Sequence, residues 1–167
     1  MILLYPVLGV VGKIPALSTF VNERKQGEFR SSMILALGIM VISISICWGV
    51  CNDKYLVLAS VYAWGVGDAF AALIGKRFGK HKIRWKIADS NKSVEGCVAM
   101  FVTSTIAVFT VLMLRGGLTS GSCALLACLT AGVCTLIELC SFDGNDTVSC
   151  PLIAMLILIP FVKILGG

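Results

Sequence analysis

The sequence predicts an all-α integral membrane protein, a polytopic transmembrane helical bundle of about five to six spans. Hydrophobic residues make up 57% of the 167 residues and charged residues only 14%, whereas a soluble domain uses about 25% charged residues. The mean hydropathy is +0.94. Apolar runs of roughly membrane-spanning length recur along the chain. No long polar linker divides them, so we expect a single domain over residues 1–167.

The apolar runs give the expected spans in order. Lys13 and Pro15 interrupt the first run, which we interpret as a re-entrant piece or the remainder of a longer amino-terminal region. The last run contains prolines, and the runs between are regular. The expected spans are Met1–Phe20, Met33–Val50, Tyr55–Gly75, Val98–Leu114, Ser122–Cys140 and Val148–Leu165.

Cysteine and histidine usage limits the possible chemistry. The eight cysteines lie mostly inside apolar runs, with no C-x-x-C pair and no accompanying histidines. This pattern is typical of small buried side chains and supports neither a zinc site nor a disulfide framework. His81 is the only histidine, which argues against a His-based catalytic triad.

Basic residues set the expected orientation. They concentrate in residues 21–32 and 76–92, two loops that are separated by two spans and therefore lie on the same side. The opposite loops carry little basic charge, with Lys54 in one and Arg115 in the other. The positive-inside rule makes the basic side cytoplasmic. Such loops often do no more than fix orientation and contact anionic lipid.

A third loop, residues 141–150, returns to the same side and contains Asp143 and Asp146. Acidic and basic loops therefore converge at one face of the bundle. This convergence is the first indication of a functional site.

Asp68 interrupts an apolar run about seven residues before its end, which is roughly 10 Å along a helix. An ionisable group in a span costs roughly 2.5–3.5 kcal/mol at the bilayer centre and usually faces the protein interior. Ala72, Gly75 and Gly79 share its helical face. Such small residues permit either close helix packing or approach of phosphate to the backbone. A structural Asp paired with a lysine or a backbone group is the alternative to a site.

Two further clusters fit phosphate and metal chemistry. In "NKSVEG", Ser93 can cap a helix, Lys92 can face phosphate, and Glu95 lies in the first turn. Glu138, Asp143 and Asn145 offer the oxygen ligands that Mg²⁺ prefers. Each cluster also has an ordinary explanation, as a helix cap or a solvated acidic loop. "GKRFGKH" is not a Walker loop, because its spacing differs and no Ser or Thr follows its Gly-Lys.

Taken together, these motifs resemble a family signature. Asp68 to Lys80 followed by Lys92-Ser93-x-Glu95-Gly96 is similar to the D-x-A-x-x-x-G-x-x-x-G-K … K-[ST]-x-E-G pattern. That pattern occurs in CTP-dependent lipid-alcohol kinases, such as dolichol, phytol and farnesol kinases, and a version occurs in membrane phosphatidate cytidylyltransferases. "NERKQGE" and "ELCSFDGNDTVSCPL" resemble elements of the kinase branch, and the ending typical of the cytidylyltransferases is absent.

The sequence also departs from the family pattern. Gly144 stands where the kinases often have a second Asp. The upstream R-K-x-x-H helix of many members is absent, so the domain is expected to be a shortened form, a fragment or inactive alone.

The resemblance implies phosphorylation of a membrane lipid alcohol of polyprenol, dolichol or phytol type, with CTP as donor and Mg²⁺ as cofactor, at the cytoplasmic membrane face. Asp68 and Asp143 are the expected metal ligands or base, with Glu138 as a third catalytic residue. Lys80 and Lys92 are expected to neutralise phosphate. The remaining expected nucleotide-binding residues are Gly75, Gly79, Ser93, Glu95, Gly96 and Asn145.

Other functions remain open at this point. A cytidylyltransferase would transfer CMP to a lipid phosphate at the same face. A small transporter or scaffold would use the charges only as topology signals. We expect no nucleic-acid binding, because the basic loop is too short and lies against the bilayer. The particular lipid, the particular membrane (plasma membrane or endoplasmic reticulum) and the oligomeric state are not encoded in these motifs.

Overall fold

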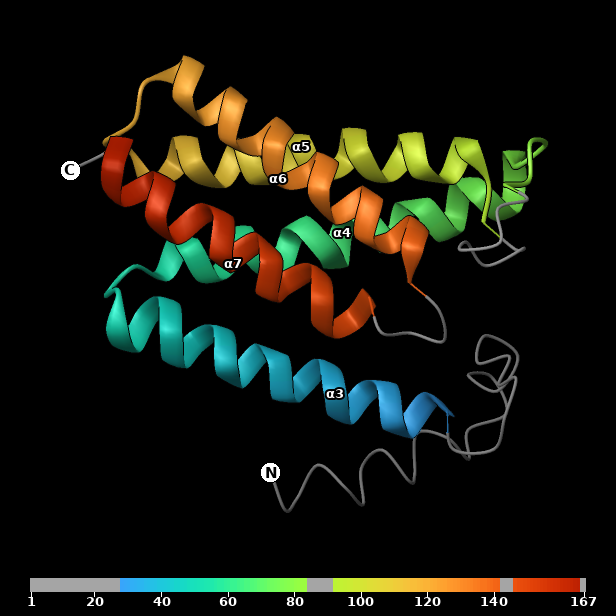
Figure 1. Cartoon of the computed structure of the whole chain (residues 1–167), viewed down its shortest axis with the longest axis horizontal. Helices are drawn as coiled ribbons and strands as arrows, with labels where there is room; N and C mark the ends of the chain where they lie inside the picture. Colours follow the sequence, from blue (N-terminus) through green and yellow to red (C-terminus); the bar gives the residue numbers. More distant parts are fainter. Residues whose placement is uncertain (1–27, 84–91, 142–145, 166–167) are drawn as a thin grey trace.

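The computed structural model describes residues 28–83, 92–141 and 146–165. They form α3 (Glu28–Ser43), which continues as the π-helix η1 (Ile44–Val50), then α4 (Lys54–Phe78), α5 (Val94–Arg115), α6 (Ser120–Cys140) and α7 (Asp146–Leu165). Figure 1 shows these helices running along one common direction. The described residues contain no β-strand, only an isolated bridge between Lys82 and Ser93. The predicted all-helical bundle is confirmed.

Four helices are long and apolar enough to cross a membrane, namely Lys54–Phe78, Val94–Arg115, Ser120–Cys140 and Thr147–Leu165. A shorter apolar helix spans Ile34–Val50. Each corresponds to one of the expected runs. The expected first span, Met1–Phe20, lies outside the described residues.

Polar side chains define the helix starts. Asp53 caps α4 by accepting a hydrogen bond from Tyr55 N–H at 3.0 Å, and Ser93 caps α5 by accepting from Gly96 N–H at 3.2 Å. Thr119 Oγ1 accepts from Ser122 N–H at 3.3 Å before α6. These are the side chains that satisfy the orphan donors of a first helical turn. The capped starts fix where each chain segment turns back into the bundle.

Helices α4 and α5 are the most extensively packed pair, and small residues bring their backbones together. Gly67 faces Met100 and Ser104, and the Ser104 hydroxyl donates to the Ala63 carbonyl at 2.6 Å. Such close, hydrogen-bonded contacts are how helices associate in a bilayer. They hold the face of α4 that carries Asp68 in a fixed position.

The alternating course of the chain gathers several helix ends at one end of the bundle. The carboxyl ends of α4 and α6 and the amino ends of α5 and α7 lie toward the right of Figure 1. We call this the basic end, after Lys76, Arg77, Lys80, Lys82 and Lys92. At the opposite end, Arg115 Nε lies 2.5 Å from Asp53 Oδ2 and joins the start of α4 to the end of α5.

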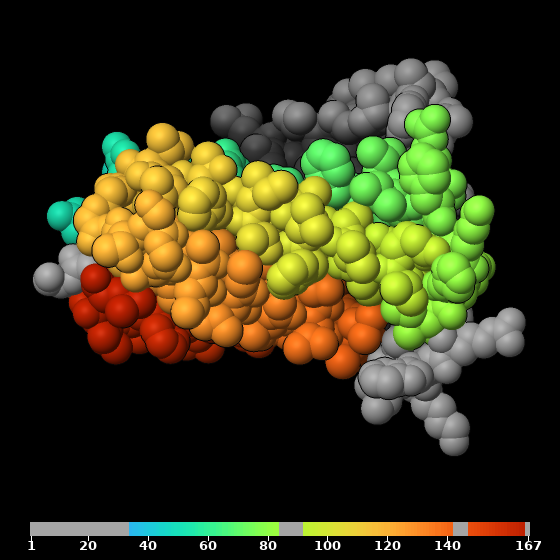
Figure 2. Space-filling view, turned by 90° about the horizontal axis from the view of Figure 1, so that it is seen from above, coloured from blue at the N-terminus to red at the C-terminus, as the bar shows by residue number. Residues whose placement is uncertain are grey.

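The outer surface of the bundle is apolar. Figure 2 shows the face that α5 and α6 form side by side. Large hydrophobic side chains of both helices are exposed there or elsewhere on their surfaces, among them Val98, Val102, Ile106, Leu125, Leu129 and Leu136. An exposed apolar surface of this extent is typical of a protein that faces lipid. The charged side chains described above, Asp68 apart, therefore lie at the two ends of the bundle.

Candidate functional site

A cavity of about 470 Å³ opens at the basic end, between α4, α5 and the last turn of α6. Its wall combines carboxylates, lysines and small residues. The lining residues are Asp68, Ala71, Ala72, Gly75, Lys76, Gly79, Lys82, Lys92, Ser93, Gly96, Cys97 and Glu138. A volume of this size is in the usual range for small-molecule sites.

The structure brings together seven of the residues expected from the sequence to form a site, namely Asp68, Gly75, Gly79, Lys92, Ser93, Gly96 and Glu138. Lys80 and Glu95 are not among the lining residues, although both are at the same end. Asp143 and Asn145 lie outside the described residues. The roles assigned to these residues stay predictions.

Lys76 and Lys82 also line the cavity, and the sequence motifs had not singled them out as ligands. Lys82 is placed there by its pairing with Ser93. Beside this isolated bridge, Ile83 N–H donates to the Lys92 carbonyl and Val94 N–H to the His81 carbonyl, each at 3.0 Å. The residues on either side of segment 84–91 are therefore held side by side, and Lys82 faces the cavity from this base.

The glycines of the motif are sites of close contact. A Cβ at Gly79 would collide with the Gly75 carbonyl oxygen and lie 2.8 Å from Ser93 Oγ. A Cβ at Gly96 would lie 3.0 Å from the Ala71 carbonyl oxygen. Real Cβ atoms need more room, so both positions require glycine for packing. Close packing of α4 and α5 is thus one function of the small face that includes Gly75 and Gly79.

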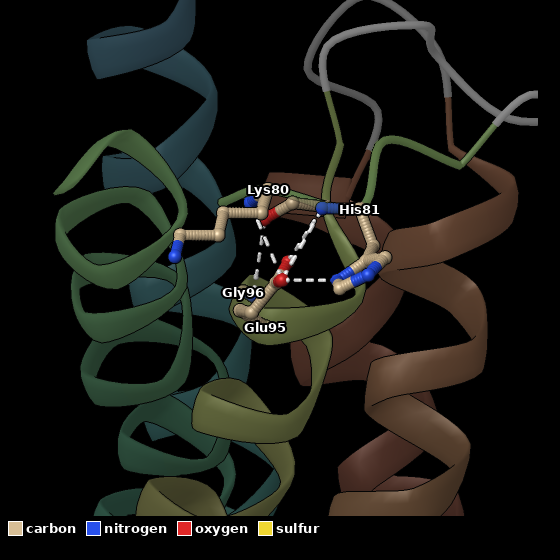
Figure 3. A network of polar contacts seen from close by, with 5 residues as sticks. Lys80, His81, Glu95 and Gly96 are labelled. Atoms are coloured by element: carbon tan, nitrogen blue, oxygen red, sulfur yellow. Dashed lines mark hydrogen bonds and ion pairs between the residues drawn. The ribbon is translucent and has the colours of Figure 1, made fainter. Parts of the chain in front are cut away.

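Glu95 anchors the segment that follows α4 (Figure 3). Its Oε1 accepts hydrogen bonds from the backbone N–H groups of Lys80 at 3.3 Å and His81 at 3.2 Å. His81 Nδ1 lies 2.8 Å from the same oxygen. The Lys80 side chain extends away from this network in Figure 3. Sequence reasoning had given His81 no role, because only the chain's path shows that it meets Glu95.

Lys92 bridges to the end of α6. Its ammonium group lies 3.1 Å from Glu138 Oε1. It also donates to the backbone carbonyl of Glu138 and, at 3.1 Å, to that of Ser141. The side chains are 19% exposed for Lys92 and 11% for Glu138. A nearly buried ion pair therefore forms one wall of the cavity.

The described residues contain no group of three or more His, Cys, Asp or Glu side chains placed to hold a metal ion. Within the cavity, the carboxylates are those of Asp68 and Glu138. Because Asp143 lies outside the described residues, its predicted part in metal binding is not decided by this geometry.

Comparison with known proteins identifies relatives of part of the chain. The dolichol kinase sec59 of Schizosaccharomyces pombe is 47% identical over 58 residues, which is 35% of this chain and 10% of that protein. The dolichol kinase of Saccharomyces cerevisiae is 35% identical over 85 residues, or 51% of this chain and 15% of that protein. The resemblance expected from the motifs is confirmed over these stretches.

The matches cover a small share of those kinases, so they relate this chain to a part of each. No family model matches the chain. No solved structure matches it significantly.

Proposed function

We propose, from this relationship to the dolichol kinases, that the chain phosphorylates a membrane lipid alcohol of dolichol or polyprenol type at the basic end of the bundle. The donor is CTP, the metal is Mg²⁺, and the site faces the cytoplasm. The observation that carries the proposal is the cavity, which places Asp68, from within a span, together with lysines of the membrane surface. The partial identity to two dolichol kinases supports the choice of acceptor.

Depth is the first argument for a lipid acceptor. Asp68 precedes Gly75 by seven residues in the same helix, a rise of roughly 10 Å. The cavity therefore extends from the phosphate-accessible end of α4 to a carboxylate nearer the lipid core. A lipid hydroxyl can reach Asp68 while its hydrocarbon chain stays among apolar side chains, and the nucleotide approaches from the aqueous end.

Charge is the second argument. Lys76 and Lys82 line the cavity, and lysine ammonium groups are common point-charge ligands of phosphate. Phosphoryl transfer requires positioning and stabilisation of charge on the transferred group more than covalent chemistry by the protein. Cations on the cavity wall meet this requirement where the terminal phosphates would lie.

In the proposed reaction, the lipid hydroxyl oxygen attacks the γ-phosphorus of CTP in line with the leaving oxygen. The new O–P bond forms as the bond between the γ-phosphorus and the β–γ bridging oxygen breaks, which releases CDP. The hydroxyl proton passes to Asp68 or through it to water. Asp68 positions the hydroxyl, and Lys76 and Lys82 stabilise charge on the phosphates.

The donor set of the cavity fits Mg²⁺. This ion is usually held by one or two carboxylates, with substrate phosphates and water completing its octahedral shell. Asp68 would be the protein ligand among the cavity's residues, and Asp143 is the second expected from the sequence. When bound, Mg²⁺ would neutralise phosphate charge and orient the triphosphate.

The test uses the chain in detergent micelles with polyprenols, dolichol, phytol, diacylglycerol and phosphatidate as acceptors. CTP is labelled at either the α- or the γ-phosphate, and Mg²⁺ is present or removed with EDTA. Transfer of the γ label alone supports the kinase, and the acceptor that takes it identifies the substrate. Transfer of the α label would identify a cytidylyltransferase instead.

Asp68→Asn tests the site within the same assay. The amide keeps the shape of the carboxylate but neither accepts a proton nor attracts a cation as the carboxylate does. We expect transfer to fall by about 100-fold or more. Unchanged turnover in a folded Asp68→Asn protein would refute this site.

A further inference from the structure

The lysines that line the cavity differ in their surroundings. Lys92 is 19% exposed and is held by one carboxylate oxygen and two carbonyl oxygens at the end of α6. Lys76 and Lys82 are exposed, and no ion pair within the described residues engages either of them. These surroundings predict different roles, although the sequence alone made Lys92, together with Lys80, an expected phosphate ligand.

We infer that Lys92 is a positioning residue, which fixes Glu138 and the last turn of α6 against the α4–α5 pair, while Lys76 and Lys82 are the cations that bind phosphate. The assignment of Lys76 and Lys82 rests on the proposed function. The structural role of Lys92 does not rest on that function. Lys92 links the segment just before α5 to Glu138 and Ser141 at the end of α6, and we call this contact the clamp.

Helix electrostatics support the clamp. The last carbonyl groups of a helix lack intrahelical partners and carry partial negative charge. The Lys92 ammonium group satisfies the carbonyls of Glu138 and Ser141 at the end of α6. The Glu138 carboxylate, 3.1 Å away, adds a full negative charge to the same place. Three acceptors of this kind use the three N–H donors of one lysine.

Burial makes the pair difficult to separate. Removing one partner of a poorly exposed ion pair leaves an uncompensated charge, which is strongly unfavourable. If Lys92 left Glu138 to bind a phosphate, that carboxylate would stay in the cavity wall, only 11% exposed, beside the incoming anion. The pair is therefore better suited to shape the wall than to exchange partners during each reaction cycle.

The remaining charges of the cavity suit a nucleotide. Besides the Lys92–Glu138 pair, the cavity lining includes the carboxylate of Asp68 and the ammonium groups of Lys76 and Lys82. The two surface lysines add positive charge that attracts an anionic ligand. Both lysines are exposed, so their flexible side chains can adopt rotamers that reach phosphate oxygens.

The first experiment measures thermal unfolding of the nucleotide-free chain in detergent. The variants are Lys92→Met, Glu138→Gln and the double variant, with Lys76→Met and Lys82→Met as matched controls. We expect each single change at the pair to lower Tm and the double variant to be no less stable than the worse single variant. The controls should stay within about 2 °C of the unmodified chain, as surface changes usually do. Additive losses for Lys92→Met and Glu138→Gln would overturn the clamp.

The second experiment measures CTP binding and turnover in the variants that fold. If Lys92→Met and Glu138→Gln do not fold as single variants, their double variant is used instead. We expect Lys76→Met and Lys82→Met to weaken CTP binding by about 10-fold each. The double variant should bind CTP within about threefold of the unmodified chain but lose about 100-fold in kcat, because its catalytic wall is misplaced. A loss of CTP affinity in the double variant as large as in Lys76→Met would overturn the division of roles.

The two experiments separate the inference from the proposed function. If the unmodified chain binds no CTP, the proposed function and the assignment of Lys76 and Lys82 both fail. The unfolding cycle would still decide whether Lys92 and Glu138 act as a coupled pair.

Discussion

The carboxylate of Glu95, in the first turn of α5, lies 2.8 Å from Nδ1 of His81, which follows the end of α4. The same carboxylate accepts hydrogen bonds from the backbone N–H groups of Lys80 and His81. One side chain therefore ties the segment after α4 to the start of α5, directly beside the cavity. This arrangement gives the Glu of the "NKSVEG" motif a local role that does not require contact with nucleotide.

The first prediction concerns this tie. Glu95→Gln removes the negative charge and weakens the acceptor for both backbone donors, so the segment should open more often. We expect hydrogen exchange at the Lys80 and His81 amides to become roughly tenfold faster, measured by mass spectrometry on the chain in detergent.

His81→Gln is the matched control, because it removes only the imidazole contact and leaves the Glu95 carboxylate with its backbone donors. The His81 side chain is 80% exposed, and exposed ion pairs contribute little. Exchange should then stay within about twofold of the unmodified chain. Equal acceleration in both variants would show that the imidazole, not the backbone hydrogen bonds, holds the segment.

The second prediction compares helix caps at opposite ends of the bundle. Ser93→Ala removes the cap of α5 and Thr119→Ala that of α6. Each should cost about 1 kcal/mol of stability, measured by denaturant unfolding in mixed micelles. Only Ser93 lines the cavity, so lipid phosphorylation should fall in Ser93→Ala and stay unchanged in Thr119→Ala. Loss of activity in both would mean that the assay follows stability rather than the site.

Hydropathy was sufficient to predict the bundle, because each span in a bilayer must satisfy its backbone hydrogen bonds within itself. Its largest errors lie at helix starts, and the expected end of α4 at Gly75 also falls short of Phe78. The run expected from Val98 begins at Val94 in the structure, since the Ser93 cap and Glu95 are polar and lie in the first turn. Polar first turns lower the hydropathy of a window although they belong to the helix.

The site was predictable where its residues follow each other at helical spacing. Asp68 and Gly75 lie in α4 and Gly79 is its C-cap, and the structure places all three at the cavity. The contacts of Lys92 with Glu138 and of His81 with Glu95 were not predictable, because they join residues far apart in the chain. The choice of Lys82 over Lys80 depends on the bridge to Ser93, which has no signature in the sequence.

The last prediction separates packing from backbone conformation at Gly79. Its φ of −66° is open to any residue, so conformation alone does not require glycine. A Cβ there would collide with the Gly75 carbonyl oxygen and approach Ser93 Oγ to 2.8 Å. Gly79→Ala must therefore shift the backbone at the end of α4, and with it the contact with Ser93 before α5. We expect a loss of about 1–3 kcal/mol of stability together with weaker CTP binding.

Gly65→Ala is the control within the same helix, because nothing lies within 4 Å of a Cβ at Gly65. Alanine is the better helix former by about 1 kcal/mol, so this variant should be as stable as the unmodified chain or slightly more so. Unfolding and CTP binding are measured on both variants in the same micelles. If Gly79→Ala matches Gly65→Ala in both measurements, the end of α4 accommodates a methyl group without loss of stability. Close approach of α4 and α5 would then not be what shapes the cavity.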